Sequence, residues 1–425
     1  MFTKHYGRNC ARIYLIISAQ LVYFLIVIFA CQEVSPEKEE VDSLEKDGHQ
    51  ISFDSVTFFK KLDRKIKKFK KEGGLFEFAG EVTLDIGHEY IGRYDISHYA
   101  EHSNPATLIG YNNTLHSLEI VDWDNQNIVT SLRLDREGPN GMRNVVGVFY
   151  HNPDSIFVLS DFHLLLMNIN GEIKLNYAIN QTATSKLRGI DFSEQILAPG
   201  KGRPIYFYGP QNVLIIPTRH TKHDQWVIPE FYESAVCAKV SLEDRNVELL
   251  PLYYPEAYRK QCFGFSNKSF FAYNGKKVVV GFSNSPQLIS YDLESEMVSS
   301  HDCRSMFYKK MAPFTGHTGD ETAMVAYVNR YTQYMSLYYN PNKQKYYLMS
   351  GFKEEDFPGI KFNLSIINED FVTLSELTLS PYFPPIGMIS TSTGLAFWDY
   401  AKSNNEKSIY QIINLDYEPL KPAHW

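Results

Sequence analysis

The sequence contains little cysteine. Only five cysteines occur in 425 residues, and none forms a Cys-x-x-Cys pair or a Cys/His pair at zinc-binding spacing. We therefore expect neither a disulfide framework nor a structural zinc site. Outside the N-terminal segment, which holds Cys10 and Cys31, the chain has Cys237, Cys262 and Cys303. These three allow either one disulfide with one free thiol or three unpaired cysteines.

Recognised catalytic motifs and an excess of basic charge are also missing. The chain has no G-x-S-x-G nucleophile elbow, no H-E-x-x-H, no P-loop and no G-x-G-x-x-G. We therefore assign no catalytic residue, no metal ligand and no cofactor. The formal net charge of −7 is the opposite of the basic surface that nucleic-acid binding needs, so we expect no nucleic-acid partner. We also expect the chain to be a monomer.

The first thirty residues have the layout of a secretory signal. Lys4, Arg8 and Arg12 form a basic leader, Ile13–Phe29 is nearly all apolar, and Ile28-Phe29-Ala30-Cys31 follows. The last four residues resemble the lipobox of bacterial lipoproteins, in which the cysteine carries the lipid. We predict a signal peptide over 1–30 and lipid attachment at Cys31. Cleavage there removes three basic residues and leaves a net charge of −10. An uncleaved membrane anchor and a buried helix are the alternatives, although seventeen residues is short for a bilayer span.

Residues 31–74 are expected to form a tether and an amphipathic basic helix. Gln32–Gln50 is too polar to fold alone. Its acidic residues resemble the signal that sends some Bacteroidota lipoproteins to the cell surface, or they form an ordinary linker. Phe58–Lys71 has apolar residues at helical spacing, surrounded by lysines. Such a helix can lie on an anionic membrane or pack on the folded domain, and we favour packing.

Residues 75–425 show short apolar and aromatic runs separated by polar turns, which indicates an all-β fold. One unit recurs: a strand, a second strand, and an Asx-rich turn into a third. The turns fall at Asp122, Asn168, Ser241, Asp292, Asn340 and Asn414. The first strands are Thr107–Tyr111, Ser155–Ser160, Asn212–Thr218, Lys277–Ser283, Thr322–Val328 and Gly394–Tyr400.

This repeat predicts a six-bladed β-propeller, with another all-β fold as the alternative. Phe76–Ile86 is expected to complete the last blade as a closing strand. The wider gaps between units predict insertions at about Ala183–Lys201 with His220–Tyr232, and at about Lys353–Pro385.

The stretch Leu134–Gly141, with Gly147-Val148-Phe149 and Asn152–Val158 after it, resembles a known family. It is similar to uncharacterised Bacteroidota lipoproteins with a TolB-like, six-bladed β-propeller domain. The resemblance implies export, lipidation and the propeller fold. It supplies no catalytic or binding residue to carry over.

Three loops carry weak candidates for ligand binding. Arg136 and Glu137 could face a central channel or pair with each other, although a structural turn is the favoured interpretation. The side chains of His220, His223 and Trp226 are of kinds that can bind a sugar or an anion. The favoured interpretation is that these residues belong to a polar, exposed loop. The third loop has His317 and Asp320, whose side chains could act as an acid and a base. The alternative is an ordinary surface loop, where such residues are common.

Two functions remain open. The first is a non-catalytic lipoprotein in the cell envelope, on the periplasmic or surface face of the outer membrane, that binds or scaffolds a protein, peptide or glycan. The second is an envelope hydrolase or lyase that acts on carbohydrate in the propeller channel. A role as a sensor or assembly factor is not separable from the first by sequence.

Overall fold

The computed structural model describes residues 78–85, 94–178, 186–187, 190–191, 195–200, 202–221, 229–259, 261–317, 320–353, 360–379, 387–399, 402–404 and 407–415. The predicted signal peptide, Cys31, the tether and the basic helix lie outside these residues. Among the described helices, none is both long and apolar enough to cross a bilayer.

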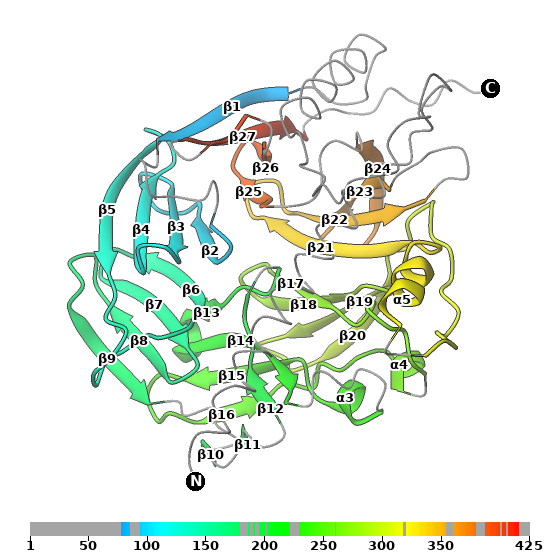
Figure 1. Cartoon of the computed structure of the whole chain (residues 1–425), viewed down its shortest axis with the longest axis horizontal. Helices are drawn as coiled ribbons and strands as arrows, with labels where there is room; N and C mark the ends of the chain where they lie inside the picture. The colour runs from blue at the N-terminus through cyan, green and yellow to red at the C-terminus, as the bar shows by residue number, and fades with distance from the viewer. Residues whose placement is uncertain are drawn as a thin grey trace, which may run out of the picture.

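The described chain is all-β, and its antiparallel sheets curl around one centre in a propeller-like ring (Figure 1). The first group of strands is β2 (Ser97–Ala100), β3 (Thr107–Asn112), β4 (Ser117–Asp122) and β5 (Asn127–Arg133). The second is β6 (Val145–Asn152), β7 (Ser155–Ser160), β8 (His163–Met167) and β9 (Ile173–Ala178). The third is β12 (Gln195–Leu197), β14 (Val213–His220), β15 (Cys237–Ser241) and β16 (Val247–Leu249), with β13 (Tyr206–Tyr208) beside β14.

The remaining strands continue the ring. The fourth group is β17 (Ser269–Tyr273), β18 (Lys277–Phe282), β19 (Ser285–Asp292) and β20 (Val298–Asp302). The fifth is β21 (Gln333–Asn340), β22 (Lys345–Phe352), β23 (Lys361–Asn368) and β24 (Thr373–Leu379). The sixth is β25 (Ile389–Thr391), β26 (Gly394–Trp398), β27 (Lys407–Asn414) and β1 (Phe78–Asp85). The short elements are β10 (Lys186–Leu187), β11 (Ile190–Asp191), η1 (Gly209–Gln211), α3 (Pro229–Glu233), α4 (Glu256–Arg259) and α5 (Glu321–Val328).

Strand β1 closes the ring from the opposite end of the sequence. It pairs antiparallel with β27 from Phe78↔Ile413 to Asp85↔Lys407, and Figure 1 shows the two strands side by side. A single parallel bridge, Asp85↔Asn127, then joins it to β5 of the first group. The predicted closing strand is therefore confirmed over Phe78–Asp85, and the rest of the predicted range lies outside the described residues. The last sheet therefore takes a strand from each end of the described chain, and the β1–β27 ladder opposes fraying at this junction.

The core lies between neighbouring sheets. Strands β3 and β4 are buried at every position, whereas β5 alternates between exposed and half-buried residues, as expected for an outer strand. The contact between the second and third groups is typical: Phe157 and Leu159 of β7 join Leu214 and Ile216 of β14 in one apolar cluster. Each sheet therefore buries its apolar faces against its neighbours in the ring, so that no single large core is needed.

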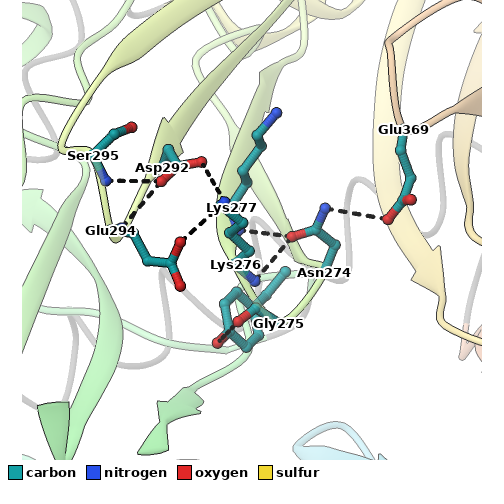
Figure 2. A network of polar contacts seen from close by, with 9 residues as sticks. Asn274, Gly275, Lys276, Lys277, Asp292, Glu294, Ser295 and Glu369 are labelled. Atoms are coloured by element: carbon teal, nitrogen blue, oxygen red, sulfur yellow. Dashed lines mark hydrogen bonds and ion pairs between the residues drawn. The ribbon is translucent and has the colours of Figure 1, made fainter. Parts of the chain in front are cut away.

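Side chains of Asn and Asp hold the turns, as predicted. In Figure 2, Asn274 Oδ1 accepts from the backbone nitrogens of Lys276 at 3.1 Å and Lys277 at 2.7 Å. Asp292 Oδ1 accepts in the same way from the backbone nitrogens of Glu294 at 3.1 Å and Ser295 at 3.0 Å. These backbone hydrogen bonds lower the pKa of Asp292. Asn274 also donates to Glu369 Oε1 at 3.5 Å, which links the fourth and fifth groups.

The fifth unit differs from the prediction. The predicted strand Thr322–Val328 is the helix α5, whose N-terminus is capped by the Asp320 side chain, which accepts from Ala323 N at 2.9 Å. Its buried residues Met324, Tyr327 and Val328 recur at helical spacing. Strand β21, which leads into the predicted turn at Asn340, instead begins the fifth group and pairs with β22.

The predicted insertion over Lys353–Pro385 is also wrong, because it contains β23 and β24. The turn that corresponds to Asp122 and Asp292 in this unit lies at Asn368, whose Oδ1 accepts from Val372 N at 2.8 Å. The error followed from α5. Because this helix was predicted to be the first strand of the unit, the segment that contains β23 and β24 was left over and was predicted to be an insertion.

Candidate functional site

The connector between β5 and β6 folds into a tight loop for reasons visible in its sequence. Gly138 has φ +92°, which favours glycine. A Cβ atom at Gly141 would lie 2.9 Å from the backbone of Glu137, so a side chain does not fit there. The loop closes with hydrogen bonds from Gly141 N to Gly138 O at 3.1 Å and from Met142 N to Asp135 O at 2.8 Å. The predicted structural turn is therefore present.

Asn176 of β9 holds this loop against the second sheet. Its Nδ2 donates to Pro139 O at 3.0 Å and to Asn140 Oδ1 at 2.7 Å. Its Oδ1 lies 2.9 Å from His163 Nδ1. One amide thus joins the loop to β8 and β9, which fixes the loop relative to the short turn between β7 and β8.

An open pocket of about 370 Å³ lies where the loop meets that turn, and it is lined by Arg136, Glu137, Gly138, Gly141, Arg143, Phe162 and His163. The guanidinium of Arg143 lies 3.8 Å from the carboxylate of Glu137, with both side chains mostly exposed. The Phe162 side chain is 37% exposed. Two guanidinium groups, one carboxylate and one aromatic ring in a shallow pocket suit the binding of a polar or anionic ligand.

The charge of Arg136 also acts on a buried pair in the first sheet. The Tyr111 hydroxyl lies 2.7 Å from His116 Nδ1. Burial is the largest cause of both pKa shifts: it raises the pKa of Tyr111 and lowers the pKa of His116. The positive charge of Arg136 opposes the first shift and adds to the second. A neutral Tyr–His pair therefore lies near Arg136 at neutral pH, outside the pocket lining.

The structure brings together Arg136 and Glu137 but not the other candidates. Glu137 pairs with Arg143, not with its neighbour. His220 ends β14 in the third sheet and is half-buried, and His223 and Trp226 lie outside the described residues. His317 is exposed, and Asp320 caps α5. Of the described candidates, His220, His317 and Asp320 do not line the pocket.

Sequence analysis missed Arg143, Phe162 and His163. Arg143 lies only six residues beyond Glu137, and this short separation in the sequence could have indicated that both belong to one site. Phe162 and His163 come from a separate hairpin. Only the packing of the second sheet against the connector places them beside Arg136.

The cysteines in the described chain are unpaired. Cys237, Cys262 and Cys303 form no disulfide, which excludes the alternative of one bridge with a free thiol. Burial raises the pKa of Cys237 and of Cys303 to about 12, so both thiols stay protonated and unreactive at neutral pH. Within the described ranges, no three His, Cys, Asp or Glu side chains are placed to hold a metal ion.

The curled sheets around one centre define an all-β, propeller-like class of protein. Residues 44–376 match the Domain of unknown function (DUF4221) family, and the chain belongs to this family. It is similar to the crystal structure of a DUF4221 family member from Bacteroides vulgatus, with a TM-score of 0.64 and 19% identity over 80% of this chain and 97% of the other.

More distant similarity extends to other solved structures. Regucalcin from Agrobacterium tumefaciens has a TM-score of 0.41 and 10% identity over 82% of this chain and 99% of its own. Virginiamycin B lyase from Staphylococcus aureus has a TM-score of 0.40 and 11% identity over 79% of this chain and 99% of its own. Both scores are too low to bear on function. A comparison with curated proteins finds no match.

Proposed function

We propose that this chain is a lipoprotein of the cell envelope whose propeller binds or scaffolds a protein, peptide or glycan without catalysing a reaction. The observation that carries the proposal is the open pocket beside the β5–β6 connector. Asn176 fixes its loop at Pro139 and Asn140, so the backbone that carries Arg136 and Glu137 is held in place before a ligand arrives. Such preorganisation lowers the entropic cost of binding.

The pocket supports binding better than glycoside cleavage. Most glycoside hydrolases need two carboxyl groups across the scissile bond. The residues that line this pocket include one carboxylate, that of Glu137, which is largely exposed and faces Arg143. The alternative, a carbohydrate-active hydrolase or lyase, therefore has less support.

The finer architecture is part of the same proposal. A signal peptide over 1–30 is removed, lipid on Cys31 anchors the chain on the periplasmic or surface face of the outer membrane, and residues 31–74 form the tether and helix. Residues 75–425 form a monomeric TolB-like propeller, in which the six strand groups are six blades. Two or more acyl chains are enough for stable anchoring.

Metabolic labelling tests the anchor. Cells grown with a labelled fatty acid are expected to yield a labelled protein, and Cys31→Ser is expected to lose the label. An unlabelled wild-type protein, or an equally labelled variant, would contradict the anchor.

Crosslinking in the native envelope tests the site. A photoreactive residue at position 162, in the pocket, is expected to capture a specific envelope component. The same residue at position 129 is the matched control, because Val129 is 55% exposed on the outer strand β5. Equal capture at both positions would contradict a ligand site in the pocket. Turnover of an envelope glycan that is lost in Glu137→Gln would favour the enzyme instead.

A further inference from the structure

We propose that the pocket recognises a uronic acid residue of a glycan, with Arg136 and Arg143 holding the sugar carboxylate and Phe162 packing on the face of the ring. This inference rests on the proposed binding function and names its ligand class. It combines three features of the pocket: its local charge, an exposed aromatic ring, and its size.

The local charge is opposite to that of the chain. The pocket lining has two guanidinium groups and one carboxylate, in a protein with a formal net charge of −7. Within the described part of the chain, Arg136 makes no ion pair. The lining therefore carries an excess of positive charge, and an acidic ligand meets two guanidinium groups there.

Both arginines keep hydrogen-bond donors for a ligand. The separation of 3.8 Å between Arg143 and Glu137 is too long for a charge-assisted hydrogen bond, which needs about 2.7–2.9 Å. A second carboxylate near the pocket, that of Asp161, accepts from Asn144 Nδ2 at 2.8 Å. Neither carboxylate forms a close bidentate pair with an arginine of the pocket, so the guanidinium fork can still accept a planar carboxylate from a ligand.

The aromatic ring and the size favour a sugar over a peptide. Phe162 is one of the few large apolar side chains on the described surface, and it lines the same pocket as the two arginines. A volume of about 370 Å³ is near the lower end for ligand pockets, which start at about 300 Å³. One pyranose ring fits this space with its apolar face on Phe162, whereas an acidic peptide would need a longer groove.

Calorimetric titration of the purified full-length protein with sodium D-glucuronate and with D-glucose tests the proposal. Glucuronate is expected to bind more tightly than glucose. Because hydrogen bonds to charged groups are strong, Arg136→Gln and Arg143→Gln are expected to weaken glucuronate binding roughly ten- to hundredfold and to leave glucose unchanged. Phe162→Ala is expected to weaken both sugars by about three- to tenfold.

Two further variants sharpen the test. Glu137→Gln removes the carboxylate that competes for Arg143 and is expected to tighten glucuronate binding by up to about fivefold. Lys174→Gln is the matched control, because it removes a cation from β9 of the same sheet that pairs with Asp154 at 3.4 Å, outside the pocket lining. Its affinity is expected to equal that of the wild type. Circular dichroism confirms that each variant is folded.

The outcomes separate the ligand class from the function. Equal affinity for the two sugars, arginine variants without effect, or tighter binding of tetraglutamate through the same arginines would overturn the uronate proposal. If crosslinking at position 162 still captures an envelope component, the binding function stands without it. If crosslinking fails as well, the proposed function fails with it.

Discussion

Replacement of Leu84 by alanine tests whether the closing strand stabilises the whole ring. Leu84 lies in β1, is fully buried, and belongs to an apolar cluster with Leu108 of the first group and Tyr410 of the sixth. The cluster therefore spans the junction at which the two ends of the described chain meet. Truncation of Leu84 should therefore weaken the packing of both the first and the sixth strand groups.

The expected cost follows from the size of the side chain. Replacement of a fully buried leucine by alanine removes its transfer free energy and leaves a cavity, which together cost about 2–5 kcal/mol. Leu84 lies in a ladder of seven residue pairs between β1 and β27, so the surrounding structure can close little of the cavity. We therefore expect the free energy of unfolding to fall by about 3 kcal/mol. Unfolding in urea, followed by tryptophan fluorescence, measures the change in the free energy of unfolding.

Native-state hydrogen exchange shows where the loss acts. If β1 is an integral part of the ring, amides of β27 and β5 are expected to lose protection together in Leu84→Ala. Val129→Ala, on the exposed side of β5, is the control and should change stability by less than about 0.5 kcal/mol. A Leu84→Ala variant as stable as this control would refute the closure argument.

Two other predictions concern buried or half-buried carboxyl groups. The buried Glu119 accepts from the Tyr94 hydroxyl at 2.5 Å and from Asn112 Nδ2 at 2.7 Å, so Tyr94→Phe should cost about 1–3 kcal/mol in chemical unfolding, and a neutral result would show that the hydroxyl is dispensable. Glu101 accepts from Asn342 at 2.6 Å, and burial raises its pKa to about 7. Between the ordinary glutamate pKa of 4.5 and about 7 the unfolded chain releases the proton first, so stability should fall as pH rises through this range. Glu101→Gln should flatten that part of the pH profile of the melting temperature, and an unchanged slope would contradict the assignment.

Local chemistry predicted most of the strands. Alternating or continuous apolar runs marked β3, β7, β14, β18 and β26, and Asx residues marked the turns at Asp122 and Asp292. These signals are local, because an Asn or Asp side chain bonds to its own turn wherever the strands later pair. The closing strand was also predictable, because a strand pattern before the first unit had no partner nearby in sequence.

Helix α5 shows where the local pattern failed. Thr322–Val328 is short and apolar, and such runs cannot be assigned to strand or helix by periodicity alone. Its capping residue, Asp320, was noticed in the sequence for its chemistry and not for its position before the run. The cap decides the helix because it satisfies a backbone nitrogen of the first turn.

The all-β class, the positions of most strands, and the glycine-rich loop that carries Arg136 and Glu137 could be read from the amino-acid sequence. These properties depend on side-chain alternation and on backbone preferences within a few residues. Packing of the folded chain brings Arg143, Phe162 and His163 to the same pocket. That pocket exists because two sheets pack side by side and Asn176 ties the loop to its neighbour, and contacts between segments so far apart in the chain leave no local pattern in the sequence.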